Sequence, residues 1–190
     1  HTSCPLHELT PGVFAEGFGF DGSSIRGYQE IQESDMLLMP DPATALLDPF
    51  LADQTLSLIC DVREPAAKGL YDRSPRTIAH RAEEYLRSTK IADTAYFGPE
   101  AEFFIFDHVQ YDQSACGACY RVDSVEGTWR TGAEEDGHNL GYKIRHKEGY
   151  FPTPPADQHQ DVRSAMGREL ERAGIRVENC HHEVATAGQA

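Results

Sequence analysis

Residues 96–106 have the sequence Tyr-Phe-Gly-Pro-Glu-Ala-Glu-Phe-Phe-Ile-Phe, in which two carboxylates open an apolar, aromatic run. The run predicts a strand from about residue 94 to residue 106. Because side chains alternate along a strand, Glu100 and Glu102 should share one face. Two adjacent carboxylates repel each other unless a cation holds them, and their oxygens suit Mg²⁺ or Mn²⁺. An edge strand whose first residues stay in solvent explains the pattern equally well.

The composition is that of a globular protein. The chain has 190 residues, of which 39% are hydrophobic, enough for one ordinary domain or two small ones. Its 31 acidic and 17 basic residues give a net charge of −14, which argues against nucleic acid or an anionic membrane surface as partner. No run reaches the roughly twenty apolar residues that a membrane-spanning helix needs.

Both ends of the sequence and its cysteines carry information about context. The chain begins at His1 without an initiator Met or a signal peptide, and it stops abruptly at Ala190, so we expect a fragment of a longer protein. The five cysteines are an odd and scattered set. They do not indicate a disulfide framework and suit a reducing cytosol, so we expect a cytoplasmic protein.

The first 70 residues predict a small sheet-rich unit. Short strands are expected at residues 35–40, 43–47 and 55–62, separated by Pro and Gly. Ser74 followed by Pro75 predicts the start of a helix that ends near Thr89. A domain boundary is expected at residues 64–73, where Pro, Gly and charged residues gather.

The second half predicts a further helix and strand. Residues 107–150 are Gly-rich, with a hairpin expected around residues 120–125. A helix should follow Pro155 and stop at Gly174, and a strand should run from residue 175 toward residue 185. The helix should turn four residues inward: Val162, Met166, Leu170 and Ala173. Helix followed by strand, twice, behind a strand-rich unit predicts the α+β class.

Two short motifs match known patterns but lack the required context. Residues 17–22 match GxGxxG, yet the segment that follows shows no helical stripe, so we expect a flexible loop rather than a dinucleotide site. Cys116 and Cys119 have CxxC spacing without a second pair to complete a zinc site, so we expect two loop or hairpin cysteines.

A second group of possible metal ligands lies near the end of the chain and consists of His181, His182 and Glu183. Neighbouring residues of a regular strand alternate faces, so these three cannot all ligate one ion without a bulge, and we expect one inward member. Glu178 would face away from Glu183 on a regular strand. Both could serve one cavity if the strand is bulged or if they contact different parts of a large ligand.

Six sequence blocks, taken together and in this order, resemble bacterial type I glutamine synthetase. They are residues 20–25 (Phe-Asp-Gly-Ser-Ser-Ile), 33–36 (Glu-Ser-Asp-Met), 48–50 (Asp-Pro-Phe), 97–104 (Phe-Gly-Pro-Glu-Ala-Glu-Phe-Phe), 149–152 (Gly-Tyr-Phe-Pro) and 181–189 (His-His-Glu-Val-Ala-Thr-Ala-Gly-Gln). The resemblance spans the whole chain. It implies a β-grasp-like N-terminal domain at residues 1–70, with its beginning missing, and an incomplete catalytic domain at residues 71–190.

The resemblance also implies an activity, its cofactors and an assembly. The family joins ammonium to L-glutamate with ATP, through γ-glutamyl phosphate, and uses Mg²⁺ or Mn²⁺. Its members are homododecamers of two hexameric rings, with active sites between neighbouring subunits. By resemblance, Glu100 would ligate the ion beside the nucleotide phosphates, Glu102 and Glu183 the ion beside glutamate, and Glu178 would contact ATP.

The ammonium site is implied in the same way. Asp21 and Ser24 match a loop that a neighbouring subunit contributes, in which Asp21 would take a proton from ammonium. Tyr150 would line that pocket together with Glu183. On the residues alone, an Asp before Gly is more often a turn residue, and a Tyr before Phe-Pro more often packs.

Two other functions remain open. One is a related glutamate–amine ligase, against which the Asp-Gly-Ser-Ser loop at residues 21–24 argues. The other is a non-catalytic, metal-binding or regulatory relative, against which the retained acids Glu100, Glu102 and Glu183 argue. Since the remaining metal and substrate ligands of the family would follow Ala190, we expect the chain alone to be inactive.

Overall fold

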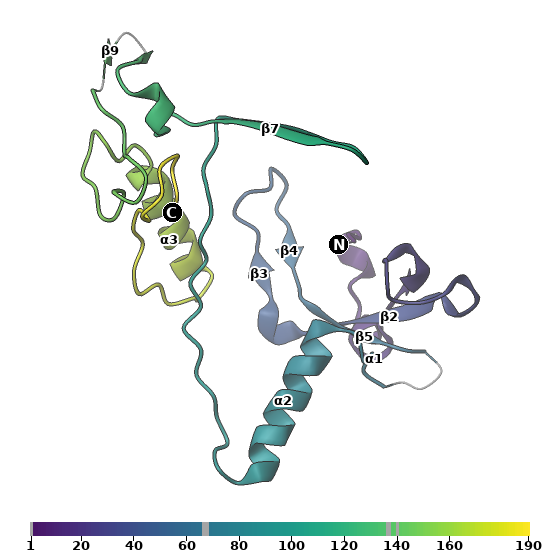
Figure 1. Ribbon diagram of the computed structural model, residues 1–190. Coiled ribbons are helices and arrows are strands. Elements are labelled where there is room, and N and C mark those ends of the chain that lie inside the picture. The colour runs from purple at the N-terminus through teal and green to yellow at the C-terminus, as the bar shows by residue number, and fades with distance from the viewer. Residues whose placement is uncertain (1, 66–68, 136–137, 140) are drawn as a thin grey trace. The chain divides into compact units, whose positions relative to one another are not determined.

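The computed structural model describes residues 2–65, 69–135, 138–139 and 141–190, and the chain forms two compact units, His1–Phe97 and Gly98–Ala190 (Figure 1). Each unit combines helix with antiparallel strands, so the α+β class is confirmed. The domain boundary near residue 70 stays a prediction. Within the described ranges, no helix is both long and apolar enough to span a bilayer.

The helices and strands have the following bounds. The α-helices are α1 (Pro11–Glu16), α2 (Pro75–Thr89) and α3 (Gln160–Arg172). The 3-10 helices are η1 (Leu6–Glu8), η2 (Gly22–Ser24), η3 (Ile31–Glu33), η4 (Pro42–Thr44) and η5 (Thr128–Arg130). The strands are β1 (Phe18–Asp21), β2 (Asp35–Pro40), β3 (Leu46–Leu47), β4 (Leu56–Ser57), β5 (Cys60–Arg63), β6 (His108–Gln113), β7 (Ala118–Asp123), β8 (Glu134–Glu135) and β9 (His138–Asn139).

An antiparallel sheet in the order β1-β2-β5 organises the first unit. The predicted strand at residues 35–40 is confirmed as β2, the central strand. The expected flexible loop at residues 17–22 is wrong, because its backbone pairs with β2 as β1. Met36, Val62 and Tyr71 form the buried core, and the Tyr71 hydroxyl donates a hydrogen bond to the Tyr28 carbonyl.

The other two strands predicted in this unit are shorter than expected. The 43–47 prediction reduces to β3, because Asp41 accepts a hydrogen bond from the Ala43 N–H and forms η4 there. The 55–62 prediction divides into β4 and β5. β4 pairs with β3 and β5 pairs with β2, so the division separates two small sheets.

Helix α2 begins and ends where the sequence predicts. Pro75 is its first residue and Thr89 its last, and Lys90 then adopts a left-handed conformation. Arg76 holds the helix to the sheet through contacts of 2.7 Å with both Asp41 and Asp61. Burial alone would raise the pKa of Asp61, but Arg76 and, to a smaller extent, His80 outweigh burial, and the pKa lies below its usual value.

The predicted strand from residue 94 to residue 106 is wrong in its extent. The chain forms only an isolated bridge between Phe104 and Gln189. Backbone hydrogen bonds join Phe103 to Ala190 and Ile105 to Gly188 at 2.8–3.0 Å. The predicted alternation is nevertheless present, since Phe103 and Ile105 are half-buried and the residues between and beside them are exposed.

The strand expected from residue 175 to residue 185 is absent from this described segment. Instead, the Glu183 N–H donates to the Gln189 carbonyl at 2.9 Å and closes a loop over residues 183–189. Ala187 and Gly188, both with φ near +70°, turn the chain back there. The loop thereby returns to the extended segment that contains Phe104.

Helix α3 is confirmed, but its predicted buried face is wrong. Val162, Met166 and Leu170 are each about two-fifths exposed, whereas Arg163 and Gly167 are buried. Arg163 forms an ion pair with Asp157 just before the helix, with both side chains buried. This pair, rather than the apolar stripe, determines which face turns inward.

The hairpin expected around residues 120–125 is larger than predicted. It consists of β6 and β7, which pair over six residues each and extend as an arm from their unit (Figure 1). Cys119 lies in β7 and Cys116 in the connecting loop, and both are exposed free thiols. The interpretation of this CxxC as two hairpin cysteines is therefore confirmed.

The core of the first unit yields a stability prediction. Met36→Ala should lower the free energy of unfolding by about 2–5 kcal/mol, because it removes a buried side chain and leaves a cavity. Met36 is 1% exposed. The matched control is Ile31→Ala, since Ile31 is 76% exposed. Urea unfolding measures both, and equal losses would contradict this description of the core.

Candidate functional site

Three side chains of the second unit converge on one point. Glu100, His181 and Glu183 each offer a ligand atom, and these atoms all lie within 4.8 Å of one another. Glu100 is exposed, whereas His181 and Glu183 are largely buried. Two carboxylates at this distance repel each other unless a cation lies between them. Carboxylate oxygens suit Mg²⁺ or Mn²⁺, so the donor set fits a divalent ion.

The backbone at residues 181–183 explains why two members of the group come from one segment. His181 and Glu183 lie on one side of the chain, and His182 is buried on the other. The expectation of one inward member is therefore wrong, because alternation brings the outer two together. Glu183 is held further by its own carboxylate, which accepts a hydrogen bond from the Val184 N–H at 3.1 Å.

Aromatic rings fix the orientation of His181. Tyr150 and Phe151 approach its imidazole edge-on, with centroid distances of 5.4 and 4.8 Å. Its Nδ1 lies 3.2 Å from the His182 carbonyl oxygen and 3.4 Å from Glu183 Oε1. The structure thus places Tyr150, a predicted site residue, beside the group.

A buried ion pair lies directly behind the group. His182 Nε2 is 2.9 Å from Glu126 Oε2, and both side chains are fully buried. His182 Nδ1 is 2.6 Å from the Glu183 carbonyl oxygen. A carbonyl oxygen can only accept, so Nδ1 donates; Nε2 donates as well when the Glu126 carboxylate is ionised, which makes the ring an imidazolium.

Hydrogen bonds and nearby charges together affect the pKa values of Glu126 and His182 more strongly than burial does. Burial alone would raise the pKa of Glu126, but the contacts from His182 and from the Gln158 N–H bring the pKa below its usual value. Burial alone would lower the pKa of His182, but Glu126 and the Glu183 carbonyl bring it above its usual value. Both shifts favour the charged forms.

Sequence reasoning missed His181 and Glu126 as contributors to the site. The adjacent histidines were visible, but we expected one inward member among residues 181–183, although alternation places residues 181 and 183 on the same side. Glu126 lies in a Gly-rich segment without clear periodicity. Its burial is a consequence of its distant partner, which no local pattern indicates.

The structure does not bring two other predicted residues into the described three-residue group. Glu102 is exposed and accepts a hydrogen bond from Gln189 Nε2 at 3.2 Å. Glu178 is exposed, on a segment without regular structure. The roles expected for both residues stay predictions.

Asp21 and Ser24 lie in the first unit, at the end of β1. The Asp21 carboxylate accepts hydrogen bonds from Ser23 Oγ, the Ser23 N–H and Ser24 Oγ at 2.6–2.9 Å. The hydroxyls of Ser23 and Ser24 and the Ser23 N–H lower the pKa of Asp21. Asp21 is thus an ionised, exposed turn residue that caps η2, and its predicted catalytic role stays a prediction.

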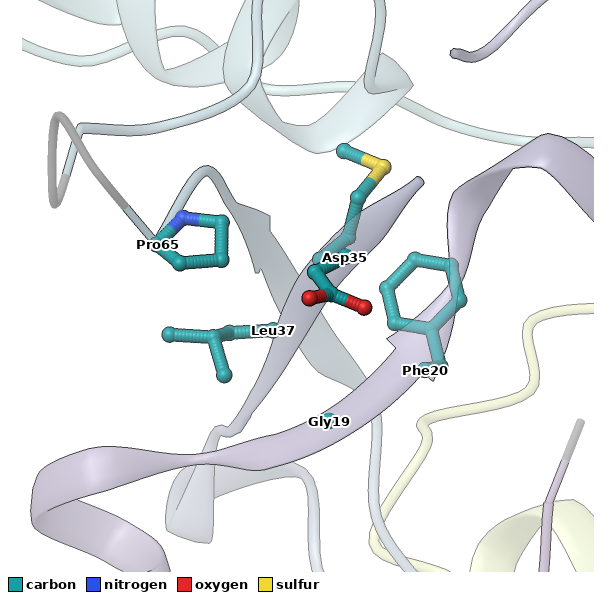
Figure 2. A pocket seen from close by; sticks show the side chains of 6 residues that line it. Gly19, Phe20, Asp35, Leu37 and Pro65 are labelled. Carbon is teal, nitrogen blue, oxygen red and sulfur yellow. The ribbon is translucent and has the colours of Figure 1, made fainter. Parts of the chain in front are cut away.

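The first unit also has a pocket of about 470 Å³. Figure 2 shows Leu37 and Pro65 on one side of the Asp35 carboxylate and Phe20 on the other. Gly19 and Met36 complete the lining. Asp35 is the acidic member of an otherwise apolar lining. The pocket therefore lacks a set of converging metal-ligand atoms like the one around Glu183.

Comparisons with known proteins identify both parts of the chain. Residues 1–65 match the family described as "Glutamine synthetase, beta-Grasp domain", and residues 72–190 match "Glutamine synthetase, catalytic domain". Glutamine synthetase of Frankia alni is 56% identical over 190 residues, and that of Escherichia coli K12 is 52% identical over 189. Each alignment covers all of this chain and 40% of the relative's length.

A solved structure agrees with these sequence matches. The cryo-EM structure of Plasmodium falciparum glutamine synthetase has a TM-score of 0.78 and 28% identity. The match covers 97% of this chain and 36% of that one. The chain therefore spans well under half the length of the relatives that it matches.

The backbone next to Glu183 yields a prediction about the site. A Cβ on Gly149 would lie 2.6 Å from the Glu183 carbonyl oxygen and 3.0 Å from that of Ala185. Gly149→Ala should therefore displace Glu183 and weaken Mn²⁺ binding, measured by titration calorimetry. The control is Gly98→Ala, since a Cβ there meets no atom within 4 Å. Unchanged affinity in Gly149→Ala would contradict the close approach.

Proposed function

We propose, since this chain belongs to the glutamine synthetase family, that it forms part of the active site of an ATP-dependent ligase. The ligase would join ammonium to L-glutamate. The product would be L-glutamine, formed through γ-glutamyl phosphate. The observation that carries the proposal is the convergence of Glu100, His181 and Glu183 within 4.8 Å. Phosphoryl transfer needs such a cation site, even in an acidic chain.

The chain's own residues would provide charge and orientation. Glu100 and Glu183 supply the anionic oxygens, and the rings of Tyr150 and Phe151 hold His181 beside them. Mg²⁺ or Mn²⁺ held there would neutralise the charge on the transferred phosphoryl group. The group would then serve two neighbouring ions: we assign Glu100 to the ion beside the nucleotide, and Glu183, together with Glu102, to the ion beside glutamate.

The position of Glu102 supports its assignment. Gln189 donates to the Glu102 carboxylate, and its side-chain carbonyl accepts a hydrogen bond from the Ala185 N–H at 3.0 Å. Glu102 is therefore linked to the loop that follows Glu183. Glu178 is assigned to ATP, which its exposed position allows.

The ammonium site would combine residues from two subunits. A homododecamer of two hexameric rings in the cytoplasm would place Asp21 and Ser24 of one subunit beside Tyr150 and Glu183 of a neighbour. The lowered pKa of Asp21 keeps this carboxylate ionised, which suits an ammonium cation. Asp21 would accept the proton that ammonium must lose before its nitrogen can attack the acyl phosphate.

An assay of the full-length protein tests the proposal. Glutamine should form from glutamate, ammonium and ATP only with Mg²⁺ or Mn²⁺ present. Glu183→Gln should lower kcat/KM by about 10²–10³, as expected for loss of a group that stabilises the transition state. The control is Glu83→Gln, since Glu83 is a helix residue paired with Arg87 on the surface. The 190-residue chain alone should be inactive.

The same assay separates the alternatives. Turnover with putrescine but not with ammonium would indicate a glutamate–amine ligase. Mn²⁺ binding without turnover of any amine would indicate a non-catalytic, metal-binding relative. Equal activity in Glu183→Gln and Glu83→Gln would contradict the proposed site.

A further inference from the structure

We propose that Glu126 is a positioning residue that fixes Glu183 in the candidate metal centre by acting through His182. The inference rests on the proposed function in one respect, namely that Glu183 ligates the ion. Glu126 itself lies behind the three converging side chains and outside their group.

An unbroken series of contacts leads from Glu126 to Glu183. Glu126 Oε2 lies 2.9 Å from His182 Nε2, and His182 Nδ1 lies 2.6 Å from the Glu183 carbonyl oxygen. The imidazole is rigid, so its two nitrogens set the direction from one acceptor to the other. A shift of the Glu126 carboxylate would therefore move the backbone that carries Glu183.

Glu126 also holds the loop beyond Glu183. Its backbone carbonyl accepts hydrogen bonds from Thr186 Oγ1 at 3.3 Å and from the Ala187 N–H at 3.4 Å. Its other carboxylate oxygen accepts the Gln158 N–H. One residue thus fixes both ends of residues 182–187, while the Glu183 carboxylate in between faces Glu100 and His181.

A buried ion pair is by itself weak support for a functional role, because such pairs also occur as purely structural contacts. The second unit contains a control for this possibility. Asp157 and Arg163 form another ion pair with both side chains buried, and Asp157 also accepts the His159 N–H. These contacts of Asp157 lie at the start of α3, not at residues 181–183.

The experiment compares these two carboxylates in the full-length protein. Mn²⁺ binding, followed by EPR, should weaken about 10–100-fold in Glu126→Gln, the usual effect of losing a partner behind a metal ligand. Asp157→Asn should lower the thermal midpoint by a comparable amount and leave Mn²⁺ affinity unchanged. If Glu126 had a purely structural role, Mn²⁺ affinity would change to the same extent in Glu126→Gln and in Asp157→Asn.

A double variant separates positioning from stability more sharply. Glu126→Gln/His182→Gln leaves no charge of this pair buried, so it should recover much of the thermal stability that Glu126→Gln loses. Its Mn²⁺ affinity should stay low, because the flexible Gln side chain carries both of its N–H donors on one nitrogen. The rigid imidazole instead places one donor toward position 126 and the other toward the Glu183 carbonyl. If Glu126→Gln alone does not fold, the Mn²⁺ affinity of the double variant tests the positioning role instead.

The outcomes distinguish the inference from the proposed function. Wild-type Mn²⁺ affinity in Glu126→Gln or in the double variant, or equal loss in Asp157→Asn, would overturn the positioning role alone. A wild-type protein that binds no Mn²⁺, or a Glu183→Gln protein that binds it normally, would overturn the proposed metal site and the inference with it.

Discussion

The buried contact between the Glu126 carboxylate and the His182 ring is the interaction on which the candidate site depends. Either charge left alone in this interior would cost about 3–5 kcal/mol, so the two must stay together. Their pairing joins segments far apart in the sequence and determines the path of residues 182–187. Since Glu183 lies on that path, a contact in the interior of the unit controls the position of the largely buried Glu183 carboxylate.

Local sequence patterns predicted those elements whose boundaries depend on neighbouring residues. Ser74 and Pro75 mark the start of α2, and the Pro at the end of residues 35–40 coincides with the end of β2. Elements that depend on distant partners were predicted less well. The extended segment around Phe104 meets residues 188–190 through a single bridge. The buried face of α3 was missed for a different reason: Arg163 turns inward to meet Asp157 just before the helix, and a buried ion pair leaves no apolar periodicity.

The residues of the candidate site divide in the same way, into those that local sequence indicates and those that depend on distant contacts. Glu100 could be identified because acids that open an apolar, aromatic run are conspicuous, and Glu183 because its segment resembles the family; the structure brings the two together. His181 was missed because a single inward member was expected among residues 181–183, whereas alternation places both His181 and Glu183 on one side. Glu126 was missed because its role depends on contacts with distant residues, His182 above all, and contacts over such separations leave no periodic signal.

The most direct test of the account is anomalous diffraction at the manganese absorption edge, from crystals of the full-length protein grown with Mn²⁺. The proposed site predicts anomalous density within ligand distance of the Glu100 carboxylate and of the Glu183 carboxylate, with Glu126 still paired to His182. Manganese bound only away from these two carboxylates, or Glu183 turned to solvent with the Glu126–His182 pair intact, would contradict it.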